Sequence, residues 1–347
     1  MGPAHFKLAT NPCKERGWNS KSRIFSSDFR GKSRQARPAL WHANGFCQLH
    51  PAPHAPTPSA LKANIPPPAL RHAPPVIVPG IPVASRRLPR KTRDVTLVLG
   101  AIPQESELVE WALMGARKGT LGGFPYVRGR IGGRPVIVAV TGIGKTNASL
   151  ITTLFVEKFR PREVIMTGTA SRINPAMRNG DVIVGEVTCN HDFGSLGDHY
   201  AMAYFGAEGP LGDSAPILYP ADPRLLAAAR RAIRRHEPEL ASHQEPPYAP
   251  VVRLGRLTAG DQFGITDERI EDIRRQLQPD LMEMESGSVA QVCWYLRTPF
   301  LCIRSGSNPT QNSPDDAYRK LSPFAARQAA LFTVSLVAEL GRKKARP

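Results

Sequence analysis

The sequence predicts an α/β fold, a single doubly wound domain with a mixed central sheet, preceded by a disordered N-terminal extension. Over residues 94–347, short apolar runs that end in glycine turns alternate with helical segments. About 250 residues fit one such domain without a second core. Residues 1–93 hold fifteen of the 34 prolines and few periodic apolar residues, so they cannot bury enough surface to fold.

The extension carries most of the positive charge. Residues 1–93 contain sixteen Lys or Arg against two acidic residues, whereas the chain as a whole has a formal net charge of +17. The domain itself is nearly neutral, so its charge implies no nucleic-acid partner, and we expect none. Three interpretations of residues 1–93 stay open: an organelle-targeting peptide, an interaction arm, or an artefact of an upstream start codon.

No apolar stretch in the sequence is long enough to predict a signal peptide or a transmembrane helix. We therefore expect a soluble protein without a membrane partner, cytoplasmic unless residues 1–93 are a genuine targeting segment. The five cysteines stand singly and show no spacing of the zinc type, which predicts no metal site and a reducing compartment.

The first half of the domain contains a predicted hairpin and a glycine turn that opens a helix. Asp94 begins the domain, and Gly132-Gly133-Arg134 is a hairpin signal. The predicted elements are a strand at Val95–Leu99, a helix at Ser106–Lys118, strands at Phe124–Ile131 and Pro135–Val140, and a helix from Thr141–Lys145 to about Phe159.

The second half alternates strands with helices and closes on an amphipathic helix. We expect strands at Glu163–Thr167, Asp181–Val187, Val252–Thr258 and Phe300–Ile303, and helices at Pro223–Arg235, Glu285–Leu296 and Pro323–Leu340. The run Phe300–Ile303 is typical of a buried parallel strand.

Two polar segments are the strongest candidates for a site. Glu283-Met284-Glu285 opens a helical stretch, and Arg304–Asn308 follows the strand Phe300–Ile303 directly. Ligands of open α/β sheets bind beyond the carboxyl ends of strands, so these residues can share a pocket. A capped surface helix beside an ordinary loop would explain the same pattern, because the helix dipole favours Glu at a helix start.

Two glycine turns directly follow predicted strands. Thr141–Lys145 lacks the spacing of a phosphate-binding loop, and position 147 is Asn where a dinucleotide fingerprint needs Gly, so we expect this turn at the rim of a pocket. Thr167–Ser171 reads as a strand end with free backbone N–H groups, which can bind an anion or sugar hydroxyls or can simply pack tightly.

Six motifs in this order resemble the purine nucleoside phosphorylase and nucleosidase superfamily, most closely the methylthioadenosine/S-adenosylhomocysteine nucleosidases. The resemblance extends from Val95 to Leu340. The motifs are Gly100–Glu105, Thr141–Lys145, Thr167–Ala170 with Gly180–Val184, Gly260–Phe263, Met282–Glu285 and Pro299–Arg304.

The resemblance implies roles for the matching residues. Glu105 resembles the carboxylate that activates the attacking water, and Arg304 the arginine that helps to hold water and acids in place. Glu285 resembles the residue that binds the ribose hydroxyls. The implied substrate-binding residues are Thr169, where the family has a serine, with Ala170, Phe263, Glu283, Met284 and Ser307. Met284 would lie against the ribose and Phe263 on the purine face.

The chain departs from this family at the position that contacts the base. Asn308 stands where adenine-type nucleosidases have an aspartic acid that protonates purine N7. An amide can hydrogen-bond N7 or a 6-oxo group but cannot protonate the leaving group, which predicts either another base or a low activity. Asp315 and Asp316, in the segment that follows, are the next acids to consider.

The phosphate-binding arginines of the phosphorylases are also missing. The loop Ile102–Glu107 carries no arginine, and Met166-Thr167 precedes Gly168, although Arg172 could substitute. We therefore expect hydrolysis of the N-glycosidic bond of a purine nucleoside or 5′-thio-nucleoside, in nucleoside catabolism or purine salvage. A phosphate-dependent phosphorylase and a weakened purine-binding or storage protein stay open. The resemblance implies no cofactor and a homodimer, and the segment 193–220 leaves the 5′ substituent undetermined.

Overall fold

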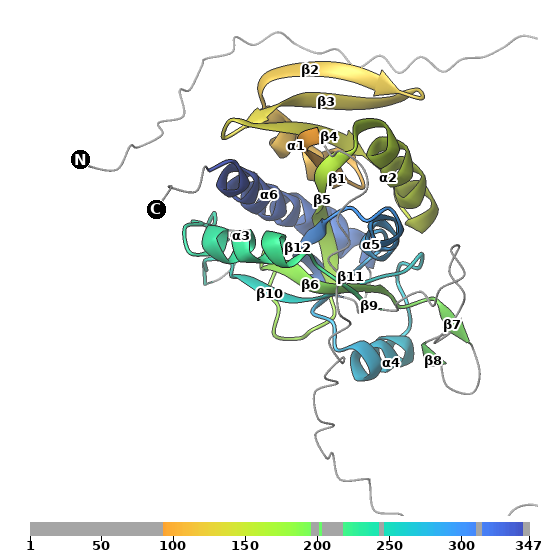
Figure 1. Ribbon diagram of the computed structural model, residues 1–347. Helices are drawn as coiled ribbons and strands as arrows, with labels where there is room; N and C mark the ends of the chain where they lie inside the picture. Colours follow the sequence, from red (N-terminus) through yellow and green to blue (C-terminus); the bar gives the residue numbers. More distant parts are fainter. Residues whose placement is uncertain (1–92, 196–200, 203–217, 243–245, 310–313, 343–347) are drawn as a thin grey trace, which may run out of the picture. The chain divides into compact units, whose positions relative to one another are not determined.

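The computed structural model describes residues 93–195, 201–202, 218–242, 246–309 and 314–342 (Figure 1). The predicted extension lies outside these residues except for Arg93, which begins the first strand. The described residues all belong to one compact unit within Pro82–Pro347.

A ten-stranded mixed sheet forms the centre of the domain, in the order β11-β10-β6-β12-β5-β1-β4-β3-β2, with β9 paired to β6. Its strands are β1 (Arg93–Gly100), β2 (Met114–Leu121), β3 (Phe124–Ile131), β4 (Arg134–Val140), β5 (Pro161–Arg172), β6 (Val182–Asn190), β9 (Leu218–Pro220), β10 (Val252–Ala259), β11 (Leu281–Glu283) and β12 (Phe300–Pro309). β7 (Gly194–Ser195) and β8 (Ala201–Met202) form a separate pair. β11 also pairs antiparallel with β5, so five of the strands close into a ring.

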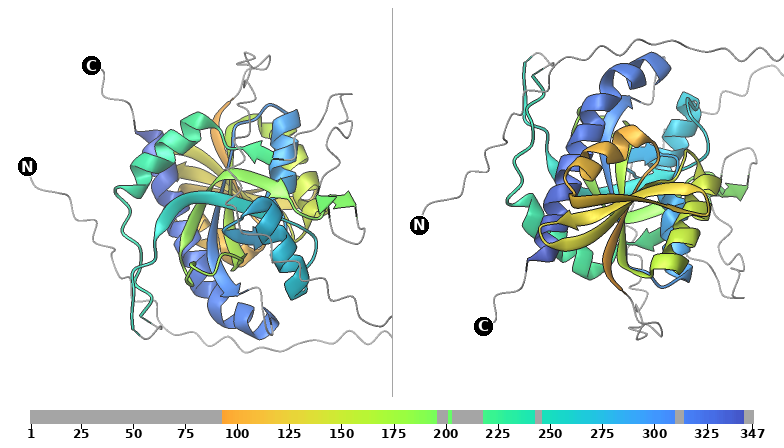
Figure 2. Two further views of the ribbon diagram at one scale, coloured as in Figure 1. Left: turned by 90° about the horizontal axis from the view of Figure 1, so that it is seen from below. Right: turned by 90° about the horizontal axis from the view of Figure 1, so that it is seen from above.

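Helices cover both faces of the sheet, as the views in Figure 2 illustrate. One face packs against α2 (Lys145–Phe159) and α5 (Ser286–Tyr295), and the other against α1 (Pro103–Trp111), α3 (Pro223–Ile233) and α6 (Pro314–Gly341). α4 (Asp267–Leu277) packs against a smaller cluster near β11. This three-layer arrangement confirms the predicted fold class.

The residues of β1 explain why it lies in the middle. Leu97 and Leu99 contribute to the core on the α2 side, whereas Val98 contributes to the core on the α6 side. β1 pairs in parallel with β4 and β5, and a strand covered on both faces needs a continuous apolar run. The predicted hairpin is confirmed, with Gly132 and Gly133 both at positive φ in its turn.

Four predictions of local structure were wrong. The predicted helix Ser106–Lys118 ends at Trp111, and its second half forms β2 because it pairs with β3. β5 continues through Arg172 instead of ending at Thr167, since its last residues pair with β12 and β11. Likewise, the segment Arg304–Asn308 is part of β12 and not a loop beyond it.

The long helix α6 is the fourth correction. It begins at Pro314, so Pro323, the predicted start, lies inside it. The part Asp316–Gly341 is long and apolar enough to cross a membrane by length and composition, contrary to the prediction that no such stretch exists. In its most apolar stretch of 18 residues, 56% is buried, and the helix packs against β5 and β12. Its apolar composition is therefore that of a core helix.

Candidate active site

A cavity of about 340 Å³ lies where the carboxyl ends of β1, β5, β11 and β12 meet. Its size and its mixture of apolar walls with a few polar groups are typical of small-molecule sites. It is lined by Ala101, Ile102, Glu105, Ile143, Thr169, Ala170, Ser171, Gln262, Phe263, Gly264, Met282, Glu283, Met284, Glu285, Ser307, Asn308 and Tyr318. Nine of the ten predicted site residues are therefore brought to one cavity, and the tenth, Arg304, lies directly behind it.

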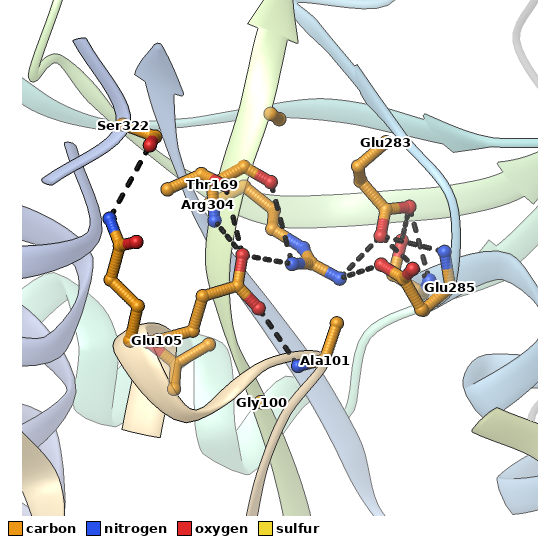
Figure 3. A network of polar contacts seen from close by, with 12 residues as sticks. Gly100, Ala101, Glu105, Thr169, Glu283, Glu285, Arg304 and Ser322 are labelled. Carbon is orange, nitrogen blue, oxygen red and sulfur yellow. Dashed lines mark hydrogen bonds and ion pairs between the residues drawn. The ribbon is translucent and has the colours of Figure 1, made fainter. Parts of the chain in front are cut away.

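Arg304 is fully buried among three carboxylates (Figure 3). Its Nη2 donates to Glu283 and, at 3.1 Å, to Glu285, while its Nη1 lies 3.6 Å from Glu105. The parallel register of β12 with β5 places Arg304 opposite Gly168, where a Cβ would overlap both Arg304 Nη1 and the Glu105 carboxyl group. Glycine at 168 thus permits Arg304 and the Glu105 carboxyl group to approach each other.

Glu283 uses its carboxylate to hold the start of α5. It accepts hydrogen bonds from the backbone N–H of Glu285 and Ser286, from the Ser286 hydroxyl, and from Arg304. Such charge-assisted bonds are about twice as strong as neutral ones. Glu283 therefore orients both Arg304 and Glu285, although it also borders the cavity.

Glu105 is held at the first turn of α1 and is only 3% exposed. Its Oε2 accepts from the Ala101 N–H at 2.8 Å, and its Oε1 accepts from the Thr169 N–H at 2.8 Å and the Thr169 hydroxyl at 2.9 Å. A carboxylate so fixed still has an Oε2 lone pair without a protein donor in the described structure. It can take a proton from a water molecule in the cavity.

Glu285 has a pKa well above that of an ordinary glutamate. Burial raises its pKa to about 8; the attraction of Arg304 opposes the shift, while the nearby carboxylates of Glu283 and Glu105 add to it. One arginine cannot neutralise three buried carboxylates, and Glu285 therefore retains a proton at neutral pH. The Gly144 N–H donates to Glu285 Oε1 at 3.0 Å and fixes its orientation.

The opposite end of the cavity is neutral. Asn308 is 1% exposed; its Nδ2 donates to the Ser171 hydroxyl at 3.1 Å and to the Pro309 carbonyl at 3.0 Å. Its Oδ1 accepts from the Ser307 hydroxyl at 2.9 Å. Since the Ser171 oxygen accepts from Asn308, the hydroxyl proton of Ser171 is available to a molecule in the cavity.

Aromatic rings form the outer wall. Phe263 is 45% exposed, unlike the nearly buried polar residues, and the Tyr318 ring meets it edge-on at 6.1 Å between centroids. Met284 lies between the two carboxylates in sequence and also lines the cavity. An exposed aromatic face beside polar groups suits a planar ligand.

Sequence reasoning missed three contributions. Tyr318 lies in a segment that was not expected to be helical, and no periodicity indicated it. Ser171 was considered only as part of a turn and not as a polar group at the neutral end of the cavity. The Gly144 N–H was expected merely at the rim of a pocket, whereas it holds Glu285. Asp316, an alternative acid by sequence, is exposed and does not line the cavity.

Residues 96–340 match the model of the family described as the phosphorylase superfamily. This range spans most of the described domain. The chain belongs to the phosphorylase superfamily.

Relatives within this superfamily are nucleosidases. The 5′-methylthioadenosine/S-adenosylhomocysteine nucleosidase of Lysinibacillus sphaericus (strain C3-41) is 31% identical over 246 residues, covering 70% of this chain and 98% of the relative. The nucleosidase of the same name from Geobacillus kaustophilus (strain HTA426) is 30% identical over 249 residues, covering 71% and 98%. The resemblance stated from the sequence is confirmed.

Solved structures agree with this assignment. The 5′-methylthioadenosine/S-adenosylhomocysteine nucleosidase of Neisseria meningitidis, in complex with methylthio-immucillin-A, superposes with a TM-score of 0.60 at 28% identity, covering 71% of this chain and 99% of the other. Futalosine hydrolase of Helicobacter pylori superposes with a TM-score of 0.59 at 24% identity, covering 71% and 99%, which shows the fold alone.

Proposed function

We propose that this chain hydrolyses the N-glycosidic bond of a purine nucleoside or 5′-thio-nucleoside and releases the free purine and the sugar. The observation that carries this proposal is the pair of Glu105 and Arg304 at one end of a cavity whose described lining contains no lysine or arginine. A carboxylate held by fixed donors can activate water, whereas a phosphate dianion needs cationic donors.

The proposed reaction is dissociative. The base departs first with the electron pair of the N-glycosidic bond and takes up a proton from solvent. Positive charge develops on the sugar beside Glu283, whose carboxylate favours it electrostatically, while protonated Glu285 binds the sugar hydroxyls. Water held near Glu105 then attacks the sugar carbon and transfers a proton to the Glu105 carboxylate. Arg304 holds the carboxylates in this arrangement without bordering the cavity itself.

The proposed base contacts are Phe263, stacked on the purine, and the polar group of Asn308, Ser307 and Ser171. Among these residues no side chain is a general acid, so the leaving base must be stabilised by hydrogen bonds alone. We therefore propose that 6-oxopurine nucleosides, whose O6 accepts a hydrogen bond, are preferred over 6-aminopurine nucleosides.

Phosphorolysis receives less support. Arg172, the arginine that could have bound phosphate, does not line the cavity, and its Nη1 donates to the Met177 carbonyl at 3.3 Å. A purine-binding or storage protein would need Phe263 but no water-activating carboxylate, and Glu105 is held as a base should be. A homodimer is proposed from the family resemblance alone.

Product analysis tests the proposal. A panel of purine nucleosides and 5′-thio-nucleosides is incubated with the protein at zero and at high phosphate, and free purine and sugar are separated by chromatography. Equal rates with free sugar as product would support hydrolysis. A strict phosphate requirement with a sugar 1-phosphate as product would assign the chain to the phosphorylases, and no purine release from any nucleoside would leave only a binding role.

A further inference from the structure

The glycine turn before α2 holds two different parts of the cavity at once. The Gly144 N–H donates to Glu285 at 3.0 Å, and the next N–H, that of Lys145, donates to Asp261 Oδ1 at 2.7 Å. The first N–H groups of a helix have no partner within it, so both are free for such contacts. Asp261 belongs to the loop Gly260–Gly264, which carries Phe263.

A second set of contacts fixes the same loop through Asp192. The Asp261 N–H donates to Asp192 Oδ2 at 2.8 Å, and the Lys145 ammonium donates to Asp192 Oδ1 while lying 3.9 Å from Asp261 Oδ2. Burial alone would raise the pKa of Asp192, but the hydrogen bonds from Lys145 and Asp261 outweigh it and hold that pKa below its ordinary value. Lys145, Asp192 and Asp261 thus connect α2, the end of β6 and the loop; we name these three residues the latch.

The loop Gly260–Gly264 also packs closely against the ring of His191. A Cβ on Gly260 would overlap the ring of buried His191, so only glycine fits where the chain crosses that ring. Beyond Gly260 the loop leaves the core, and the Phe263 side chain is 45% exposed with the edge of Tyr318 against its ring. The position of the Phe263 ring therefore depends on how the backbone around Asp261 is held.

We propose that Lys145 and Asp192 are positioning residues that hold Phe263 in place for the purine through Asp261. The inference rests on the proposed function, because it assigns the base-stacking role to Phe263. The Lys145 and Asp192 side chains are 22% and 14% exposed and the Asp261 side chain 48%, and ion pairs at partly exposed sites contribute little to global stability. The latch should therefore affect base binding much more than unfolding.

The test uses Asp192→Asn and Lys145→Met in the full chain, assayed on the nucleoside that the panel identifies as best. We expect KM to rise about tenfold in each variant, kcat to change less than about threefold, and inhibition by the free purine product to weaken by the same factor as KM. Lys145→Arg, which keeps the charge, should restore most of the affinity. Glu339→Gln is the matched control, since it disrupts the ion pairs of another mostly buried carboxylate, with Arg231, Arg235 and Arg342, beside α3 and α6.

A double-variant cycle decides whether the latch acts through Phe263. In a Phe263→Ala background, Asp192→Asn should raise KM no further. Full additivity of the two substitutions, or an unchanged KM in Asp192→Asn when Phe263→Ala raises it, would overturn the inference. If the wild-type protein releases no purine from any nucleoside, the proposed function fails instead, so the two failures are distinguishable.

Discussion

The two ends of the cavity are built on different physical principles. At the end that we propose binds the sugar (the sugar end), Glu105, Glu283 and Glu285 surround Arg304, and all four side chains are almost fully buried. At the end that we propose binds the purine (the base end), neutral hydrogen bonds connect Asn308 with its neighbours, and the Phe263 ring is partly exposed.

This difference assigns catalysis and the choice of base to different ends of the cavity. A buried charge that loses its partner costs several kcal/mol, so the charged end tolerates little change. The neutral end can change its preference through a single atom, because an amide and a carboxyl group have the same shape but differ in their protons. Catalytic power should therefore depend on the sugar end, and the choice of base on Asn308.

The largest expected effect comes from breaking the charged end at its centre. Arg304→Met leaves three carboxylates without a counter-charge, and we expect a loss of about 3–5 kcal/mol in the free energy of unfolding. Urea denaturation at pH 7 measures it. The loss should shrink as the pH falls and the carboxylates become protonated, and Arg304→Lys should be affected less. An Arg304→Met protein of wild-type stability would contradict this view of the sugar end.

Glu105→Gln should remove the base and leave the fold intact. We expect turnover to fall by at least about a thousandfold, while nucleoside affinity stays within about tenfold, since the base acts in the transition state. Steady-state kinetics with an independent binding measurement separates the two effects. The exposed acid Asp316 provides the control, because Asp316→Asn should have no effect. Normal turnover in Glu105→Gln would rule out the proposed mechanism.

The pH dependence of stability tests whether folded Glu285 keeps its proton at neutral pH. Folded Glu285 keeps its proton up to about pH 8, whereas an ordinary glutamate releases it near 4.5, so the folded state binds more protons between these values. The contribution of Glu285 to stability is therefore lost as pH rises through this window, at roughly 1 kcal/mol per pH unit, and levels off above it.

The comparison with Glu285→Gln isolates this contribution. Burial lowers the pKa of His191 to about 4, so His191 contributes with the opposite sign between pH 4 and its ordinary value of 6.5. The pH dependence of the wild-type free energy of unfolding is therefore the sum of the Glu285 and His191 contributions. Denaturation at each pH measures the difference in this free energy between the wild type and Glu285→Gln, in which the His191 contribution cancels. A difference independent of pH would show that Glu285 is ionised throughout.

The sequence predicted the layers of the fold because apolar runs such as Val95–Leu99 have no alternative to a buried strand. It failed where pairing between distant strands decided the outcome. Residues 114–118 look helical but pair with β3, and residues 168–172 look like a turn but pair with β12 and β11. Pairing partners of this kind leave no trace in local periodicity.

Predictions for the site also succeeded where the local sequence is informative and failed where contacts between distant segments decide the outcome. Glu283, Glu285 and Arg304 were found because polar residues beside a buried strand are conspicuous, whereas Glu105 was found only through the resemblance to the family. Tyr318 was missed, since its approach to Phe263 depends on α6 starting at Pro314; the sequence Ser313-Pro314-Asp315-Asp316 is a helix-start signal that could have indicated it. Contacts made by backbone N–H groups, such as that of Gly144, cannot be recognised from residue types at all.

The base preference of Asn308→Asp tests most directly the claim that catalysis depends on the sugar end and the choice of base on Asn308. In this structure the Asn308 Nδ2 faces the Pro309 carbonyl and the Ser171 hydroxyl, so burial and the carbonyl oxygen favour the protonated form of a carboxyl group in its place. That group can then act as an acid by donating to Ser171, whose own hydroxyl proton faces the cavity. The ratio of kcat/KM for 6-oxopurine and 6-aminopurine nucleosides is compared between the two proteins. We predict a ratio above one for the wild type and a reversed order in Asn308→Asp, with activity on 6-aminopurine nucleosides raised at least about tenfold. Efficient cleavage of 6-aminopurine nucleosides by the wild type, with no gain in Asn308→Asp, would contradict the assignment of base choice to Asn308.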